Sequence, residues 1–172
     1  MVKMSDKHIE RERYDKRANF ILDTNRHHEQ NKIPEYINIP YKYYFKHFEN
    51  KKGQPKLLEI GAGIGENTNV LIDMSYNIFS TDISLKSVEL MKKKFDKYPN
   101  FFAEVVDMEK LPYKNESFDI VCSAGSLSYG DNNIVLEEIF RVLKPEGTFV
   151  AIDSLNNNPI YRFNRYIHYL KG

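Results

Sequence analysis

The sequence has one cysteine, no tryptophan and no long hydrophobic run. A single cysteine, Cys122, cannot form a disulfide within the chain, so no disulfide framework holds this fold together. No stretch reaches the roughly 18 consecutive apolar residues of a membrane-spanning helix, and the first residues, MVKMSDKHIERERYDKR, are charged rather than apolar, unlike a signal peptide. We therefore expect a cytoplasmic protein without membrane association.

The chain also lacks an excess of charge of either sign. Its 172 residues include 25 Lys and Arg against 24 Asp and Glu, a formal net charge of +1. Proteins that bind nucleic acid through their overall field carry a strong basic excess, and here the basic runs are interleaved with acids or lie on helices with a buried face. We expect a small-molecule partner and no nucleic acid, and leave an oligomer open. We assign no metal site.

Strand-like and helix-like segments alternate along most of the chain. Amphipathic helices are expected at 84–98, where Ser84 is a candidate N-cap and Leu85, Val88, Met91 and Phe95 form one stripe, and at 133–143, with Ile134, Ile139, Val142 and Leu143 turned inward. Strands that alternate with helices of this length indicate βαβ units. The fold class predicted is α/β, a three-layer αβα sandwich around a Rossmann-like parallel sheet of at least five strands. Those strands are expected at 56–60, 76–82, 101–108, 117–125 and 147–153.

Glycine is scarce, with 8 residues in all, yet Gly61, Gly63 and Gly65 crowd one loop in LLEIGAGIGENT. A tight turn between a strand and a helix usually needs one glycine. Several bare positions let a ligand approach the main chain, because no Cβ stands in the way. The loop therefore predicts a ligand site at the carboxyl end of the first strand.

The residues that follow each strand are read together with this loop, since ligands of open parallel sheets bind beyond the carboxyl ends of the strands. Asp82 ends the second strand about 20 residues after the glycines, where a carboxylate can accept both hydroxyls of a ribose. A strand-terminal Asp is as often a helix N-cap, but Ser84 is available for that role here. Asp107 ends the third strand, where it would either accept the exocyclic amine of an adenine or be a solvated loop acid.

Dinucleotides and S-adenosylmethionine both carry ribose and adenine, and Glu66 favours the second. A dinucleotide fingerprint, G-x-G-x-x-G, sets a diphosphate on a helix N-terminus, whereas this loop reads GAGIGE. The carboxylate of Glu66 would repel a diphosphate and tolerate a positive sulfonium.

Five segments together resemble the motif series of the class I S-adenosylmethionine-dependent methyltransferases, and the likeness extends from about Leu57 to Asp153. The five are EIGAGIG from Glu59 to Gly65, the acid Asp82, VDMEKLP from Val106 to Pro112, SFDIV from Ser117 and LKPEGTF from Leu143.

The resemblance implies S-adenosylmethionine as cofactor and a role for each segment. The glycines, with Ala62, would pass under the methionine and ribose, and Glu59 would order the amino group. Asp82 and Ile83 would hold the ribose, and Asp107 with Met108 would frame the adenine. Ser123 and Ala124 would line the floor beside the sulfonium.

Family members often cover the cofactor with a residue from an N-terminal arm, for which Tyr14 and Arg17 are the candidates here. The resemblance thus implies a helical arm over residues 1–39 that covers the site, and a methyltransferase domain over 40–172. The C-terminal antiparallel strand pair of the family is expected to be missing, because residues 159–170 can supply only a helix, which indicates a truncated form or a five-stranded variant.

No catalytic residue is assigned. Methyl transfer is an in-line displacement that needs alignment, plus a general base when the acceptor is a hydroxyl. Tyr129, Asp131 and His168 are candidates, each with a structural alternative: a pocket wall, a helix N-cap and a surface residue. The function predicted is methylation of a small molecule. The tail from Asp153 resembles methyltransferases of surface-polysaccharide and other small-molecule pathways, and this resemblance implies a sugar or polysaccharide precursor hydroxyl as acceptor. An NAD-dependent oxidoreductase and a non-catalytic cofactor-binding domain remain as alternatives.

Overall fold

A computed structural model describes residues 3–24, 43–48, 53–74 and 76–153. Within these ranges five strands form one sheet in the order β3-β2-β1-β4-β5, and every neighbouring pair is parallel. This confirms the predicted α/β class. The elements are α1 (Lys3–Thr24), β1 (Lys56–Ile60), α3 (Thr68–Leu71) with a 3-10 turn (Ile72–Met74), β2 (Asn77–Asp82), α4 (Leu85–Lys94), β3 (Phe101–Val105), β4 (Phe118–Ala124), a 3-10 turn (Leu127–Tyr129), α5 (Asn132–Val142) and β5 (Leu143–Ile152).

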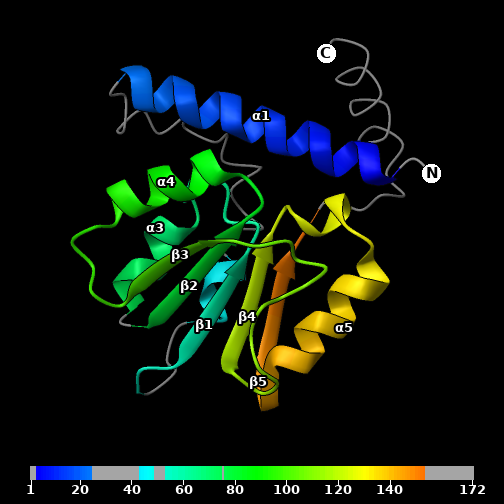
Figure 1. Cartoon of the computed structure of the whole chain (residues 1–172). Coiled ribbons are helices and arrows are strands. Elements are labelled where there is room, and N and C mark those ends of the chain that lie inside the picture. The colour runs from blue at the N-terminus through cyan, green and yellow to red at the C-terminus, as the bar shows by residue number, and fades with distance from the viewer. Residues whose placement is uncertain (1–2, 25–42, 49–52, 75, 154–172) are drawn as a thin grey trace.

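The strand order reverses between β1 and β4. The chain runs outward from β1 to β3 on one side, then returns to place β4 on the other side of β1. In an open parallel sheet this reversal parts the connecting loops and leaves room for a ligand at the carboxyl ends of the strands. α1 lies across that edge, beyond the arrowheads of the strands (Figure 1).

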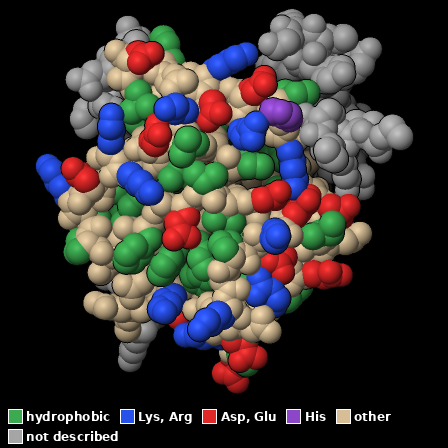
Figure 2. Space-filling model, in the orientation of Figure 1, with side chains coloured by type: hydrophobic (Ala, Val, Ile, Leu, Met, Phe, Trp, Pro, Cys, Tyr) green, Lys and Arg blue, Asp and Glu red, His purple; other side chains and the backbone are tan. Residues whose placement is uncertain are grey.

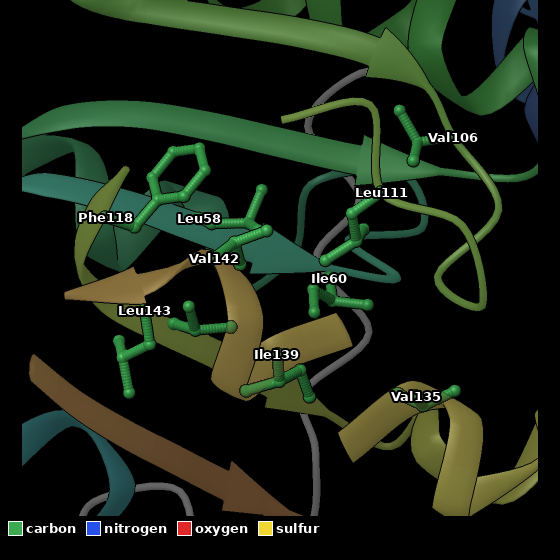
Figure 3. Packing of buried hydrophobic residues seen from close by; sticks show 10 residues of the cluster. Leu58, Ile60, Val106, Leu111, Phe118, Val135, Ile139, Val142 and Leu143 are labelled. Atoms are coloured by element: carbon green, nitrogen blue, oxygen red, sulfur yellow. The ribbon is translucent and has the colours of Figure 1, made fainter. Parts of the chain in front are cut away.

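Alternate residues of the buried strands face opposite layers of helices, which makes the fold a three-layer sandwich. Leu58 and Ile60 of β1 pack with Val135, Ile139 and Val142 of α5, in the cluster that Figure 3 shows. The other face of the same strands packs on different partners. That cluster contains Leu57, Ile78, Ile120 and Cys122 of the sheet, Leu71 of α3, and Tyr44 and Phe48 from residues 43–48.

Two helix faces differ from the predicted ones. Leu85 was expected in the buried stripe of α4, but it is 53% exposed, whereas Leu90 is buried. In α5 Ile134 is 45% exposed and Val135 is buried in its place. Each exposed residue lies in the first turn of its helix, next to a buried residue of the same turn, Ser87 in α4 and Val135 in α5.

The C-terminal boundaries also differ from expectation. Leu143 is the first residue of β5, paired with Phe118 of β4, rather than the last residue of a helix. The helix expected at 159–170 and the fate of the C-terminal strand pair lie outside the described residues.

Candidate functional site

A pocket opens where the carboxyl ends of β1, β2, β3 and β4 meet the underside of α1. It lies at the strand-order reversal, the position at which the glycine loop and the strand-terminal acids were expected to converge. Its lining consists of Lys7, Glu10, Tyr14, Gly61, Asp82, Ile83, Val106, Asp107, Met108, Ala124, Gly125, Ser126 and Tyr129.

Most of the predicted cofactor residues come together in this pocket, although they are spread over more than a hundred positions of the chain. They come from α1 and from the ends of four strands, so only the folded sheet brings them together. The predicted residues in the lining are Tyr14, Gly61, Asp82, Ile83, Asp107, Met108 and Ala124, and the candidate base Tyr129 lies there as well.

Other predicted residues lie next to the pocket but are not in its lining. Ala62 belongs to a core cluster with Val88 and Met91, and Ser123 is buried and hydrogen-bonded to Ser126, 2.7 Å between the two Oγ atoms. Glu59, Gly63 and Gly65 are also outside the lining. Their contact with a cofactor stays a prediction.

Glu59 is buried directly beneath the glycine loop. Its Oε2 accepts hydrogen bonds from Thr68 Oγ1 and Ser80 Oγ, both at 2.6 Å. Burial raises the pKa of Glu59 to about 7, a change that these two hydroxyls and Lys94 oppose and the charge of Asp82 reinforces. The side chain therefore links β1 to Ser80 of β2 and Thr68 of α3.

The glycine loop has left-handed backbone at Gly61 and Gly63, with φ of +65° and +57°. A Cβ on Gly61 would lie 2.2 Å from Cβ of Ser126, because the loops after β1 and β4 touch there. A Cβ on Gly63 would lie 3.1 Å from the ring of Tyr14. These glycines let the β4 loop and α1 close over the loop, in addition to any approach by a ligand.

Asp82 is buried at the end of β2, and both of its carboxylate oxygens accept backbone hydrogen bonds. Oδ2 accepts from Gly63 N at 2.8 Å and Oδ1 from Ser84 N at 2.9 Å. Burial raises its pKa above the ordinary value, while these N–H donors lower it. A carboxylate has about four lone-pair sites, so a carboxylate held in this way can still accept hydrogen bonds from a ligand in the pocket.

The predicted cap of α4 is confirmed, which separates the roles of the two neighbouring residues. Ser84 is the N-cap and its Oγ accepts from Ser87 N at 3.0 Å. Its hydroxyl also donates to Asp15 of α1, 2.5 Å away. The carboxylate of Asp82 is therefore not needed as the side-chain cap of the helix.

Asp107 forms an ion pair with Lys7, a residue that was not predicted from the sequence as part of the site. Lys7 Nζ lies 3.0 Å from both carboxylate oxygens of Asp107 and 2.6 Å from Glu109 Oε2. The backbone N–H of Glu109 donates to Asp107 Oδ1 at 3.0 Å. At the adenine end of the predicted site, α1 thus places a cation on the acid.

α1 is held over the pocket by contacts along its length. Arg17 pairs with Glu66 of the glycine loop at 2.7 Å, and Ala18 packs with Ile64 and Leu90. Of the two residues predicted to cover the cofactor, Tyr14 lines the pocket, whereas Arg17 is outside the lining and pairs with Glu66.

Tyr14 forms part of the roof of the pocket. Burial raises its pKa to about 12, and the neighbouring Tyr129 and Glu10 act in the same direction. The phenol therefore stays protonated near neutral pH, which suits a wall or a hydrogen-bond donor and not a base.

Two of the three candidate general bases, Asp131 and Tyr129, lie in the described part of the chain. Asp131 is the N-cap of α5 and accepts from Asn133 N at 3.1 Å, as its structural alternative predicted. Tyr129 lines the pocket. His168 lies outside the described residues.

The sequence predictions left out several lining residues: Lys7, Glu10, Val106 and Ser126. Gly125, the last residue of the strand expected at 117–125, lies in the lining as well, and Ser126 follows it directly. Lys7 and Glu10 carry no such signal, because α1 is charge-dense and the sequence does not show which of its faces meets the sheet.

Charge on the face that Figure 2 shows is mixed. Lys and Arg side chains alternate with Asp and Glu over α1, and hydrophobic side chains gather over the β3 side of the sheet. In the part of the chain that the structure describes, no group of three or more His, Cys, Asp and Glu side chains could hold a metal ion. None of the described helices is long and apolar enough to cross a membrane.

Known proteins match this chain over the same segments. The family model described as "Methyltransferase domain" matches residues 58–151. The protein named "Uncharacterized methyltransferase C25B8.09" of Schizosaccharomyces pombe is 31% identical over 105 residues, 60% of this chain and 41% of that protein. The demethylmenaquinone methyltransferase of Lactobacillus johnsonii is 34% identical over 130 residues, 70% of this chain and 52% of that protein.

A solved structure resembles the fold. The YcgJ protein of Bacillus subtilis superposes with a TM-score of 0.66 at 21% identity, covering 74% of this chain and 58% of that one. The chain spans about half the length of the curated relatives that it matches.

Proposed function

The chain belongs to the methyltransferase-domain family of class I S-adenosylmethionine-dependent enzymes, and we propose that its pocket binds S-adenosylmethionine and directs the methyl group to a small-molecule acceptor. One observation carries the proposal. Asp82 at the end of β2 and Asp107, two residues beyond β3, line the same pocket as Gly61 of the glycine loop, at the reversal of strand order. The residues that would recognise the ribose, the adenine and the methionine part of the cofactor therefore line one pocket.

The ribose would bind at Asp82. The N–H groups of Gly63 and Ser84 hold this carboxylate at the pocket wall, and its remaining lone pairs would accept the two ribose hydroxyls. Because the same carboxylate also fixes the glycine loop, binding and loop geometry depend on one side chain.

The adenine would lie between Met108 and Ile83, with its amine directed to Asp107. The methionine part would lie along Gly61 and the segment from Ala124 to Ser126. In this orientation the sulfonium points toward the loop that carries Tyr129.

The electrostatics of the lining suit a cation. Glu10, Asp82 and Asp107 line the pocket together with Lys7, which is itself paired with Asp107 and Glu109. S-adenosylmethionine, when bound, supplies a methyl carbon already activated by the positive sulfur. The residues of this chain would align it, and α1, part of the proposed 1–39 arm, would exclude water.

The dinucleotide alternative is not favoured. The helix that follows the glycine loop, α3, has four residues, which offers a poor N-terminal dipole for a diphosphate. Arg17 pairs with Glu66 and compensates its charge, so the short helix, rather than the carboxylate, disfavours a diphosphate.

The acceptor proposed is a small polar molecule with a hydroxyl, such as a sugar or polysaccharide precursor. The support is the loop SAGSLSYGD, rich in small and hydroxyl residues, of which Ala124, Gly125, Ser126 and Tyr129 line the pocket and would face the acceptor. The mixed charge of the face in Figure 2 gives no basic stripe for nucleic acid.

The test has two stages. Thermal unfolding is measured with S-adenosylhomocysteine, S-adenosylmethionine and NAD, since a ligand that binds the folded state raises the melting temperature. Stabilisation by the first two and none by NAD is expected, and the reverse order would refute the cofactor assignment.

The second stage offers methyl-labelled donor with sugar nucleotides, small amines, tRNA and protein extract in parallel. Label in the sugar nucleotides is expected. Label chiefly in tRNA or protein would refute the small-molecule acceptor.

A further inference from the structure

We infer that Lys7 competes with the adenine of the cofactor for the carboxylate of Asp107, so that α1 sets both cofactor affinity and the selectivity for an amine at the six-position of the purine. The inference rests on the proposed function of the pocket. It assigns a specificity-determining role to a residue of α1 that lies at the far end of the helix from Arg17.

The geometry places two donors on one acceptor. Lys7 Nζ reaches both oxygens of Asp107 at 3.0 Å, and Asp107 Oδ1 already accepts the N–H of Glu109. An exocyclic amine that approaches Asp107 from inside the pocket needs one of these oxygens. Three of the about four lone-pair sites of this carboxylate are in use, so the amine takes the remaining site on Oδ2 or displaces one contact of the ammonium, and in both cases it competes with Lys7 for the same negative charge.

Glu109 provides the place to which the ammonium retreats. Its Oε2 lies 2.6 Å from Lys7 Nζ, closer than either oxygen of Asp107. Its Oε1 accepts the N–H of Asp131 at 2.6 Å, which anchors the carboxylate to the start of α5. Lys7 can therefore turn from a bridge between two acids to a pair with Glu109 alone, without being left unpaired.

The rest of α1 need not move in this exchange. In the C-terminal half of α1, Asp15 accepts a hydrogen bond from Ser84, Arg17 forms an ion pair with Glu66, and Ala18 packs in the cluster with Ile64. Loss of the Lys7 contact therefore changes the adenine end of the pocket while the helix remains docked.

The experiment measures calorimetric affinities for S-adenosylhomocysteine, which carries no sulfonium charge and so isolates the adenine end. Lys7→Met removes the competing ammonium and keeps the aliphatic stem. Its affinity should rise about two- to fivefold, the scale of a partly exposed ion pair. Lys16→Met, at an exposed lysine of the same helix, is the matched control and should bind as the unmodified chain does.

Glu109→Gln tests the opposite direction. The amide oxygen can still accept from Asp131 N, but the amide no longer draws the ammonium away from Asp107. Its affinity for S-adenosylhomocysteine should therefore fall. Opposite effects of Lys7→Met and Glu109→Gln are not expected from a general loosening of α1.

A second ligand separates competition from a structural role. S-inosylhomocysteine has a carbonyl in place of the amine, and the ammonium of Lys7 would favour that carbonyl. The preference for the adenosyl over the inosyl ligand should rise in Lys7→Met. An unchanged preference, or weaker adenosyl binding in Lys7→Met, overturns the inference, whereas absence of binding by the unmodified chain refutes the proposed function instead.

Discussion

Replacing Glu59 with glutamine should remove a pH dependence of stability that originates in one buried carboxyl. Glu59 has an ordinary pKa of 4.5 that burial raises to about 7. The folded chain therefore holds this proton more tightly than the unfolded chain does. The stabilisation is complete below the unfolded pKa of 4.5 and is lost as the pH rises through about 7.

The magnitude follows from the two pKa values. A separation of about 2.5 pH units at about 1.4 kcal/mol per unit corresponds to roughly 3 kcal/mol. Between pH 5 and pH 8 the free energy of unfolding should therefore fall by about 2 to 3 kcal/mol relative to the Glu59→Gln variant. Glutamine keeps an oxygen that can accept from Thr68 and Ser80, so the variant should remain folded.

The assay is urea unfolding followed by circular dichroism at several pH values from 5 to 8. Taking the difference between the two proteins cancels the titration of groups that both share, and Glu12→Gln, at an exposed glutamate of α1, is the matched control. Parallel stability profiles for the unmodified chain and Glu59→Gln would refute the reasoning, as would a gain in relative stability toward high pH.

Three further changes test the architecture around the pocket. Gly61→Ala places a Cβ 2.2 Å from the side chain of Ser126 at left-handed backbone, so urea unfolding should show a loss about 2 kcal/mol larger than for Gly53→Ala, which has left-handed backbone and open space. Equal losses would mean that the close approach does not matter. Ser84→Ala removes the N-cap of α4 and should cost about 1 kcal/mol in the same assay, and an unchanged midpoint would contradict the capping role. Tyr14→Phe should keep the calorimetric affinity for S-adenosylhomocysteine, whereas Tyr14→Ala should lower it about tenfold by uncovering the pocket; a loss in Tyr14→Phe would give the hydroxyl the main role.

The periodicity of the sequence predicted the sheet well because its strands are continuous apolar runs separated by helices. In β1, Leu58 and Ile60 pack on one helix layer and Leu57 on the other, and all three are buried, as expected of an interior parallel strand. The helix faces were harder to predict. A shift of one residue, as between Ile134 and Val135, turns the buried stripe by about 100°, and only packing on the sheet decides it.

The candidate site was predictable where the chain places a ligand residue at a strand end. Asp82, Asp107 and Ala124 could be found from strand ends alone, and they lie in one pocket. The contribution of α1 could not, because Lys7 is one of many charged residues in a helix whose docking depends on distant partners. The burial of Glu59 could not be predicted from the sequence either, since it depends on hydroxyl groups from α3 and β2.

The most direct test of the central claim is calorimetric titration of S-adenosylhomocysteine into the unmodified chain and into Asp82→Asn, with circular dichroism to show that both are folded. Binding by the unmodified chain is expected. In Asp82→Asn the binding free energy should weaken by about 1.5 to 3 kcal/mol, the scale of hydrogen bonds to a charged group. Equal affinity in the two folded proteins would contradict the placement of the ribose at Asp82, and absence of binding by the unmodified chain would contradict the assignment of the pocket.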